Sequence, residues 1–183
     1  MAKRPVDVAR AARLVNHGPT VLVSSGRDAA ANIITLAWVT PVSIDPPLLA
    51  IAVAPARHSH GLISRAREFV VNVPPPRILD AVWYCGTHSG RVGDKFVGAG
   101  LTPTPAQTVD TPLVAECFAH VECRVEKRVT LGDHTLFVGE AVAATAESDA
   151  FDGHLRLRGR YHTLHHLGGP RFVTSAGTQM RAG

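Results

Sequence analysis

An arginine and a serine two positions apart have the types and spacing that suit a phosphate. Arg57 precedes Ser59, and Ser59 stands where a helix carrying Leu62 and Ile63 on one face would begin. The free N–H groups at the start of a helix attract anions, and a guanidinium group can hold a phosphate with two hydrogen bonds. The spacing therefore indicates a phosphate site, although an N-cap serine beside a solvated arginine would give the same pattern.

Short polar side chains recur along residues 32–49. Asn32, Thr35, Thr40 and Ser43 offer hydrogen-bond donors and acceptors, and they are small enough for a flat ligand to approach the backbone. The same residues would also cap a proline-rich turn between two strands. The segment thus predicts either a ligand-facing edge or a plain hairpin.

Two further polar groups could join a phosphate site. Asn72 ends a predicted strand, and it is either a ligand contact or a turn residue. Lys95 and Arg91 lie in a glycine-rich stretch, where Lys95 could reach a phosphate or the edge of a flat ligand and Arg91 a second anion. A solvated loop is the alternative for both cations.

Histidines raise the question of a metal. The chain has ten, with His58 and His60 flanking a serine and His162, His165 and His166 close together. Three histidines would suit zinc, but the HExxH pattern is absent and no cysteine or carboxylate completes a cluster. We therefore expect no metal. Neither a GxGxxG dinucleotide fingerprint nor a GxSxG hydrolase motif occurs, and no catalytic residue is assigned.

Composition narrows the class of protein. The chain has 183 residues, 45% hydrophobic and 19% charged, which predicts a single globular domain over residues 1–183. Its net charge of +4 fits an anionic ligand, and the scattered lysines and arginines do not indicate nucleic-acid binding. No apolar run reaches a membrane-span length and the start does not resemble a signal peptide, so we expect a cytoplasmic protein. Three cysteines, Cys85, Cys117 and Cys123, do not suggest a disulfide framework.

Strands with a few inserted helices must position these groups. This order favours a mainly β, closed or partly closed antiparallel barrel with Greek-key-like connections and peripheral helices. In residues 32–49 the first strand should end at Pro41, which lacks a backbone donor. The expected strands are 20–25, 32–39, 48–53, 69–73, 120–126 and 134–146. The expected helices are an amphipathic one over 5–15, the segment after Ser59, 77–84 and 94–96. A proline-rich surface loop covers 102–112, and a tail covers 160–183.

The run Asn-x-x-Thr-x-x-Trp, followed by Pro-Val-Ser-x-Asp-Pro-Pro-Leu-Leu, occupies residues 32–49 and resembles the flavin reductase-like family of FMN-binding split barrels, which includes flavoredoxins. Other matching pieces follow in the same order: Arg57-x-Ser59, Phe69 to Pro74, Ser89-Gly90 before Asp94-Lys95-Phe96, and a late Tyr161 to Gly169. The similarity runs from about Gly18 to Gly169, and the order of the pieces makes it specific.

The resemblance implies an FMN-binding split barrel that forms a homodimer with the flavin near the subunit interface. It implies that residues of the first strand and turn contact the flavin ring and ribityl chain, and that the start of the next helix holds the phosphate. Phe172 stands where relatives commonly have an aromatic residue with a hydroxyl. The residues implied to bind FMN are Asn32, Thr35, Trp38, Thr40, Pro41, Val42, Ser43, Arg57, Ser59, Asn72 and Lys95.

The activity implied by the resemblance is an NAD(P)H-dependent flavin reductase, in which hydride passes from reduced nicotinamide to flavin and electrons go on to an acceptor or an oxygenase component. The alternative is a non-enzymatic flavoredoxin-type electron carrier or FMN-binding protein. His120, His134 or His162 could tune the open face of the flavin, and the sequence does not choose among them. The same residues would hold FMN in either case.

Overall fold

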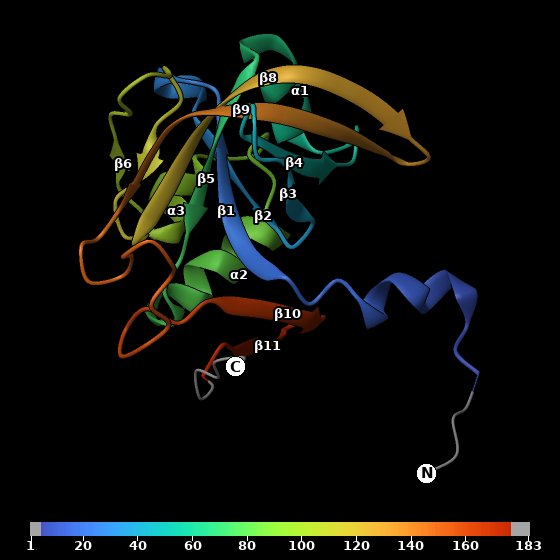
Figure 1. Ribbon diagram of the computed structural model, residues 1–183. Helices are drawn as coiled ribbons and strands as arrows, with labels where there is room; N and C mark the ends of the chain where they lie inside the picture. The colour runs from blue at the N-terminus through green and yellow to red at the C-terminus, as the bar shows by residue number, and fades with distance from the viewer. Residues whose placement is uncertain (1–4, 177–183) are drawn as a thin grey trace.

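The computed structural model describes residues 5–176 and is built around one large antiparallel sheet (Figure 1). The first four residues and the end of the predicted tail, 177–183, lie outside the described residues. The strands are β1 (Pro19–Ser25), β2 (Asn32–Leu36), β3 (Val39–Ser43), β4 (Leu48–Val53), β5 (Glu68–Val73), β6 (Pro103–Thr104), β7 (Leu113–Val114), β8 (Ala119–Leu131), β9 (His134–Ala146), β10 (Leu164–Gly168) and β11 (Arg171–Thr174). The helices are α1 (His58–Ala66), α2 (Leu79–Thr87) and α3 (Lys95–Ala99), with short 3-10 helices η1 (Val8–Leu14), η2 (Asp28–Ala30) and η3 (Pro76–Ile78).

Seven strands form the barrel, in the order β2, β1, β5, β8, β9, β4 and β3. The two ends of this path, β2 and β3, are consecutive in the chain and are joined by residues 37–38. The sheet therefore curls until its first and last strands meet where the chain passes from one to the other. The prediction of a mainly β, antiparallel barrel with few helices is confirmed.

The barrel interior holds one apolar core. It forms because the strands alternate, so that every second side chain points inward. Each barrel strand except β3 supplies a buried side chain, and α1 closes one end with Ile63. The buried members are Val21, Val23, Ile34, Ile51, Val53, Ile63, Phe69, Val71, Cys123, Val125 and Phe137.

A second core lies on the outer face of β1 and β2. Leu22 and Ile33, which alternate with the interior residues, pack there against Val82 and Cys85 of α2 and Phe96 of α3. The hairpin β10–β11 lies beside α2 (Figure 1) and joins β1 through only two residue pairs, Pro19 with His165 and Thr20 with Leu164. This outer layer places α2 directly over β2.

The expected end of the first strand at Pro41 was wrong. Pro41 lies inside β3, which pairs only with β4, and the turn comes at residues 44–47. An edge strand tolerates proline because one of its sides needs no backbone donor. The hairpin is thus formed by β3 and β4, with a shift in the pairing between Pro41 and Ser43, while β2 pairs with β1.

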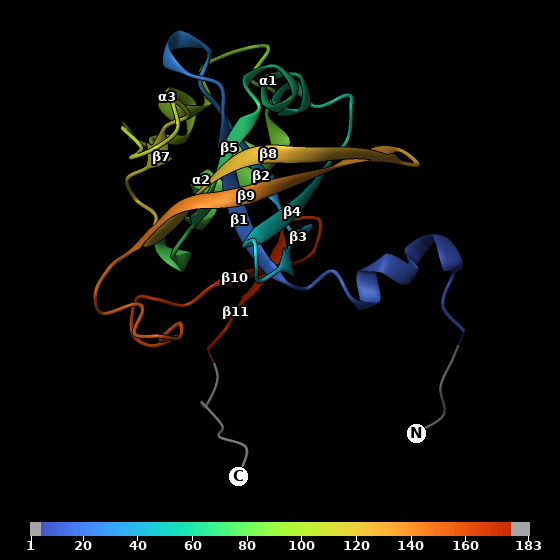
Figure 2. The same cartoon turned by 45° about the horizontal axis from the view of Figure 1, so that its top comes forward.

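The N-terminal segment differs from the predicted amphipathic helix over 5–15. The structure has the 3-10 helix η1, which has no buried residue and projects away from the barrel in both views (Figure 1, Figure 2). Asp7 caps it by accepting a hydrogen bond from the backbone of Ala9 at 3.1 Å. The predicted apolar face includes Val8 and Val15, and both side chains are exposed, so this face is not packed on the barrel.

The proline-rich segment 102–112 lies mostly at the surface, as predicted, and it is held against the barrel. Glu122 of β8 is almost fully buried and accepts a hydrogen bond from the backbone N–H of Thr108 at 2.7 Å. Glu68 of β5 accepts one from the backbone N–H of Thr111 at 2.8 Å. Carboxylates are strong acceptors for backbone donors, so these two contacts fix a segment that has little secondary structure.

No helix within residues 5–176 is long and apolar enough to cross a membrane. The cysteines Cys85, Cys117 and Cys123 are all free and buried, as the odd count suggested. Burial raises the pKa of the Cys85 thiol to about 11, which keeps it protonated near neutral pH.

Candidate functional site

A cavity of about 230 Å³ opens where α1 begins, and we call it the first cavity. It lies between the start of β2, the segment before α1, the end of α2 and the glycine-rich loop that leads to α3. The lining residues are Asn32, Ile34, Ala56, Arg57, His58, Ser59, Cys85, Gly86, Thr87, His88, Ser89, Gly90, Arg91 and Lys95.

Asn32 and Ser59 form a buried polar pair in this cavity. Asn32 begins β2 and is 3% exposed, and its Nδ2 donates to Ser59 Oγ at 2.7 Å. The Oδ1 atom of Asn32 is buried and has no hydrogen-bond partner within the described chain. Ser59 uses a lone pair in this contact, so its hydroxyl hydrogen stays available to a ligand. A buried acceptor without a partner is costly, which favours a ligand that donates to it.

The prediction that Ser59 is the N-cap was wrong. Arg57 occupies the N-cap position with extended backbone, and Ser59 is the second residue of the helix. The serine hydroxyl turns to Asn32 because the neighbouring strand β2 supplies a donor at close range. The first N–H groups of α1 thus have no side-chain cap, and His58 and Ser59, which carry them, line the first cavity.

Three cations surround the first cavity. Arg57 is exposed at its rim, and Arg91 donates through Nη1 to the backbone oxygen of Ala56 at 2.9 Å. Lys95 is 4% exposed and donates through Nζ to the backbone oxygen of Cys85 at 2.6 Å. Burial lowers the pKa of Lys95, and the nearby Arg57 adds to this effect. No aspartate or glutamate lines the cavity, so its field favours an anion.

Gly90 allows the loop backbone to lie directly over the polar pair. A Cβ atom at this position would stand 2.1 Å from Asn32 Oδ1 and 3.1 Å from Cδ2 of His58. Any other residue must therefore displace the amide. By contrast, a Cβ at Gly93 in the same loop would meet nothing within 4 Å. The glycine at position 90 is needed for a close approach, and the one at position 93 is not.

A second cavity of about 150 Å³ adjoins the first and shares Gly86 and Thr87 with it. It lies between β2, α2 and the hairpin β10–β11. Thr35 lines it, and the Thr35 hydroxyl donates to the backbone oxygen of Val82 at 2.6 Å. The lining residues are Thr20, Thr35, Ala37, Val82, Trp83, Gly86, Thr87, His166 and Phe172.

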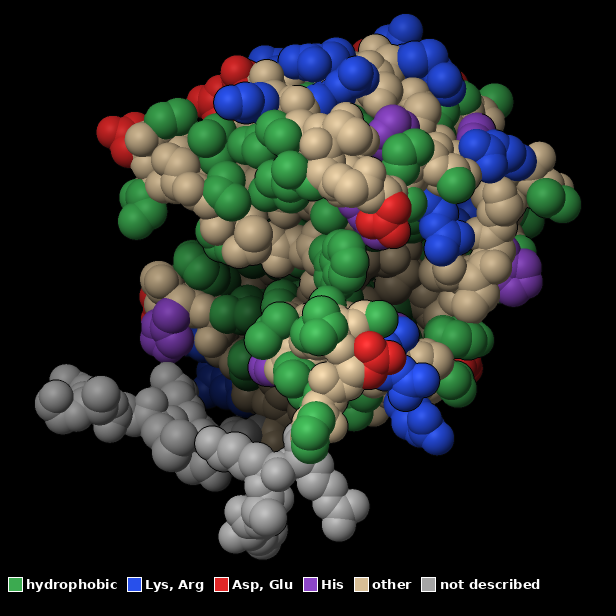
Figure 3. Space-filling model, turned by 90° about the vertical axis from the view of Figure 1, so that its right-hand side faces the viewer, with side chains coloured by type: hydrophobic (Ala, Val, Ile, Leu, Met, Phe, Trp, Pro, Cys, Tyr) green, Lys and Arg blue, Asp and Glu red, His purple; other side chains and the backbone are tan. Residues whose placement is uncertain are grey.

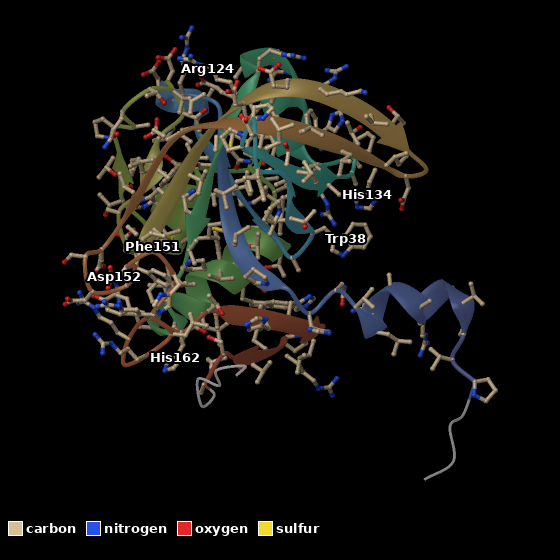
Figure 4. All side chains as sticks on the ribbon, in the orientation of Figure 1. Trp38, Arg124, His134, Phe151, Asp152 and His162 are labelled. Carbon is tan, nitrogen blue, oxygen red and sulfur yellow. The ribbon has the colours of Figure 1, made fainter. Side chains whose placement is uncertain are left out.

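The remaining predicted residues lie elsewhere. Trp38 is 43% exposed and packs on His134 with ring centroids 4.7 Å apart, at the side of the barrel (Figure 4). The predicted residues Thr40, Pro41, Val42 and Ser43 are all in the edge strand β3, and none of them lines either cavity.

Asn72 is part of the protein core and not of the first cavity. Its side chain is fully buried, and Nδ2 donates to the backbone oxygen of Leu22 and to Ser24 Oγ, each at 3.1 Å. Its Oδ1 accepts from the backbone N–H of Val114 at 2.9 Å. The structure thus brings together Asn32, Arg57, Ser59 and Lys95, with Thr35 beside them. The amide of Asn72 instead makes hydrogen bonds to neighbouring strands.

The sequence did not point to the contribution of α2. Cys85, Gly86 and Thr87 at its C-terminal end line the first cavity, and Trp83 lines the second. The one available signal was Gly86, a glycine inside a helical pattern, since a Cβ there would lie 3.3 Å from Thr35. Among residues 5–176, no three histidine, cysteine or acidic side chains come together as a metal site requires.

The stability of the fold should depend on pH through His58, which lines the first cavity. Burial lowers its pKa from 6.5, and the positive charges of Arg91, Arg65 and Lys95 lower it further. The unfolded chain then binds more protons than the folded one just below pH 6.5, so stability should fall as the pH drops through this value. Urea denaturation between pH 7.5 and pH 5.5, in a buffer without phosphate, should show this loss.

The matched variants are His58→Gln, which cannot gain a proton, and His154→Gln, which changes an exposed histidine. His58→Gln should flatten the dependence of the unfolding free energy on pH, and His154→Gln should not. The pKa of His60 is also lowered, by burial and by Arg128, so some dependence should persist in His58→Gln. Identical pH profiles for His58→Gln and the native protein would contradict the prediction.

Comparisons with known proteins show which sequences and folds this chain resembles. The family model described as a flavin reductase like domain matches residues 13–165. A protein of Pyrococcus abyssi is 38% identical over 162 residues, which cover 88% of this chain and 92% of that protein. StyB, an NADH-dependent flavin reductase of Pseudomonas fluorescens, is 30% identical over 158 residues, covering 84% of this chain and 86% of StyB. The solved structure of an FMN-binding protein from Thermus thermophilus has a TM-score of 0.83 at 27% identity, over 100% of this chain and 98% of that one.

Proposed function

The chain belongs to the flavin reductase-like family, and from this premise we propose that it is an FMN-binding flavoprotein that acts as an NAD(P)H-dependent flavin reductase. The observation that carries the proposal is the first cavity, in which Arg57, Arg91 and Lys95 surround the uncapped start of α1 and no carboxylate intervenes. A phosphate monoester carries close to two negative charges near neutral pH and matches this set of cations.

The polar atoms of the first cavity fit the phosphate-bearing end of FMN. Asn32 Oδ1 is a buried acceptor without a partner, which suits a ribityl hydroxyl. The hydroxyl hydrogen of Ser59 and the free N–H groups at the start of α1 are donors, which suit phosphate oxygens. Arg57 at the rim, with Arg91 and Lys95, would supply the charge. Trp38, Thr40, Pro41, Val42 and Ser43 lie outside both cavities, and their contact with FMN stays a prediction.

The protein holds and orients the flavin, which supplies the redox chemistry when bound by accepting a hydride from reduced nicotinamide. The relative StyB is an NADH-dependent flavin reductase, which supports NADH as a donor here. An electron acceptor or an oxygenase component would then be a partner. A flavoredoxin-type electron carrier would use the same binding residues, so the structure of the site does not separate the two functions.

The glycine-rich loop offers a direct test of this site. Gly90→Ala should lower the affinity for FMN by about 5- to 100-fold, because the added Cβ must displace the Asn32 amide at a cost of about 1–3 kcal/mol. Gly93→Ala is the matched control in the same loop, and it should bind FMN like the native protein. Titration of apo-protein with FMN, followed by the change in flavin fluorescence, measures both affinities. Equal affinities for the two variants, or no FMN binding by the native protein, would contradict the proposal.

A kinetic assay separates reductase from carrier. We expect steady-state oxidation of NADH or NADPH in the presence of added FMN. The rate of this oxidation per protein molecule should exceed the rate at which one protein-bound flavin is reoxidised. Stoichiometric reduction followed by no further turnover would identify the carrier. The visible spectrum of the purified protein shows whether the flavin is tightly bound or exchanges as a substrate.

A cytoplasmic homodimer is part of the same proposal. The face that carries Trp38 (Figure 4) is hollowed, and hydrophobic side chains gather around the hollow (Figure 3). The exposed apolar residues Trp38 and Val42 belong to this side of the barrel, at and next to the edge strand β3, and would be covered by a second copy. Light scattering at micromolar concentration would show a dimer, and a monomer that still binds flavin would oppose this part of the proposal.

A further inference from the structure

His58 lines the first cavity with a ring that makes no hydrogen bond to the described chain. It is the first residue of α1, directly after the N-cap residue Arg57, and it is half-buried. The glycine-rich loop passes close to the ring, since a Cβ on Gly90 would stand 3.1 Å from Cδ2 of His58. Among residues 5–176, neither ring nitrogen of His58 has a hydrogen-bond partner. Both nitrogens therefore remain for a ligand that enters the cavity.

Two other histidines near this site are engaged by the fold. His60 lies two residues further along α1, and its Nε2 is hydrogen-bonded to Thr135 Oγ1 at 2.9 Å. His88 also lines the first cavity, but its ring stacks on Tyr84 with ring centroids 3.9 Å apart. The Nδ1 atom of His88 lies 3.2 Å from the backbone oxygen of Tyr84. His58 is thus the histidine of this site whose ring has no structural contact of this kind.

The charges around His58 are positive in the empty cavity. The positive end of the α1 helix dipole adds to them, and no aspartate or glutamate lines the cavity. The ionisable residues around the ring are Arg57 and Arg65 of α1 and its N-cap, Arg91 of the glycine-rich loop, Lys95 of α3, and Cys85 and His88 at the end of α2.

This field keeps the His58 ring neutral near pH 7 while the cavity is empty. Burial lowers the pKa of the ring, and the charges of Arg91, Arg65 and Lys95 lower it further. A dianion inside the cavity has the opposite effect, because a negative charge nearby favours the protonated form of a histidine. The protonated ring can donate from both nitrogens, so it matches the oxygens of a phosphate.

We propose that His58 takes up a proton when a phosphate monoester enters the first cavity, and that it then binds the phosphate as a fourth cation beside the two arginines and the lysine. The inference rests on the proposed function, because FMN is the monoester expected there. The proton comes from the solvent and returns to it when the ligand leaves. Binding should therefore become tighter as the pH falls from alkaline to mildly acidic values.

Calorimetric titration of the apo-protein with FMN measures this proton. The heat of binding at pH 7.0 is compared in phosphate-free buffers that differ in their ionisation enthalpy. The native protein should take up a fraction of one proton per FMN, and His58→Gln should take up none. His154→Gln changes an exposed histidine outside the cavity and should match the native protein. His58→Asn is the second variant if His58→Gln does not fold.

The phosphate group of FMN does not produce the same signal. Its second pKa is about 6, and surrounding cations favour its dianion, so the phosphate itself releases protons on binding. Uptake and release have opposite signs in the calorimetric comparison. Riboflavin, which lacks the phosphate, should bind without proton uptake in the native protein and in His58→Gln alike.

The affinity for FMN should show the same linkage. Because both proteins bind the same ligand, the ratio of the affinities of the native protein and His58→Gln removes the titration of the ligand. We expect the native protein to bind FMN about 3- to 10-fold more tightly than His58→Gln at pH 6.5. At pH 8.5 the two affinities should be nearly equal, because the ring is then neutral in the complex as well.

The outcomes separate this inference from the proposed function. Proton uptake that persists in His58→Gln overturns the inference, and its loss in His88→Gln would then identify His88 as the proton acceptor. FMN binding that depends on Arg57 but takes up no proton leaves the proposed function standing and overturns the inference. If the native protein does not bind FMN, inorganic phosphate is the probe. Proton uptake on phosphate binding that requires His58 then supports the inference although the proposed function has failed, and no binding of phosphate overturns it.

Discussion

Replacing Arg57 by alanine should weaken FMN binding by about 10- to 100-fold and leave riboflavin binding almost unchanged. Arg57 stands at the N-cap of α1 on the rim of the first cavity, and riboflavin lacks the phosphate that it would contact. A hydrogen bond to a charged group is worth about 1.5–3 kcal/mol, and each 1.4 kcal/mol corresponds to about 10-fold in affinity. Fluorescence titration of apo-protein with both flavins provides the measurement.

Two controls make this result specific. Arg57→Lys should recover part of the loss, because an ammonium group keeps the charge but lacks the two-pronged geometry of guanidinium. Arg65→Ala removes a charge from the last turn of the same helix, outside the first cavity, and should change FMN affinity little. If Arg57→Ala weakened the binding of FMN and of riboflavin equally, Arg57 would have a structural role, and the phosphate assignment would be wrong.

Replacing Asn72 by alanine should destabilise the fold by about 2–5 kcal/mol. The change removes the acceptor of the Val114 N–H and a donor to the oxygen of Leu22 in β1, and it leaves a cavity where the fully buried side chain of β5 stood. Asn72 joins these strands to β7 through a side chain that is fully buried. Urea denaturation at pH 7.5 gives the free energy of unfolding.

Asn16→Ala is the matched control, because Asn16 precedes β1 and no side-chain hydrogen bond of it is found in the described chain. It should change the unfolding free energy by less than about 0.5 kcal/mol. A loss below about 1 kcal/mol for Asn72→Ala, combined with weaker FMN binding, would instead support the sequence-based prediction that Asn72 is a cofactor contact.

The strands were predictable because their patterns are local. Alternation in residues 120–126 indicated β8, the turn residues Gly132 and Asp133 indicated that β9 returns beside it, and apolar runs indicated β4 and β5. Pro41 misled the prediction because its effect depends on whether a strand has one neighbour or two, which only the assembled sheet decides.

The site was only partly predictable for a related reason. Arg57, Ser59 and Lys95 could be found from residue type and a helix start, and the structure brings them to one cavity. Asn72 has the same residue type as Asn32, and both are buried in strands. The difference is that backbone groups and the Ser24 hydroxyl pair with both ends of the Asn72 amide, whereas Oδ1 of Asn32 has no partner in the described chain. Such pairing depends on contacts between segments far apart in the chain.

The unpartnered Asn32 Oδ1 has a consequence for the lifetime of the chain in a cell. A buried acceptor that no group of the described chain satisfies lowers the stability of the empty protein by about 1–3 kcal/mol, and a ligand that donates to it recovers that amount as part of its binding free energy. The fraction of unfolded chains, on which proteases act, therefore rises when the ligand is scarce. The abundance of the protein should follow the supply of its ligand without any dedicated regulator.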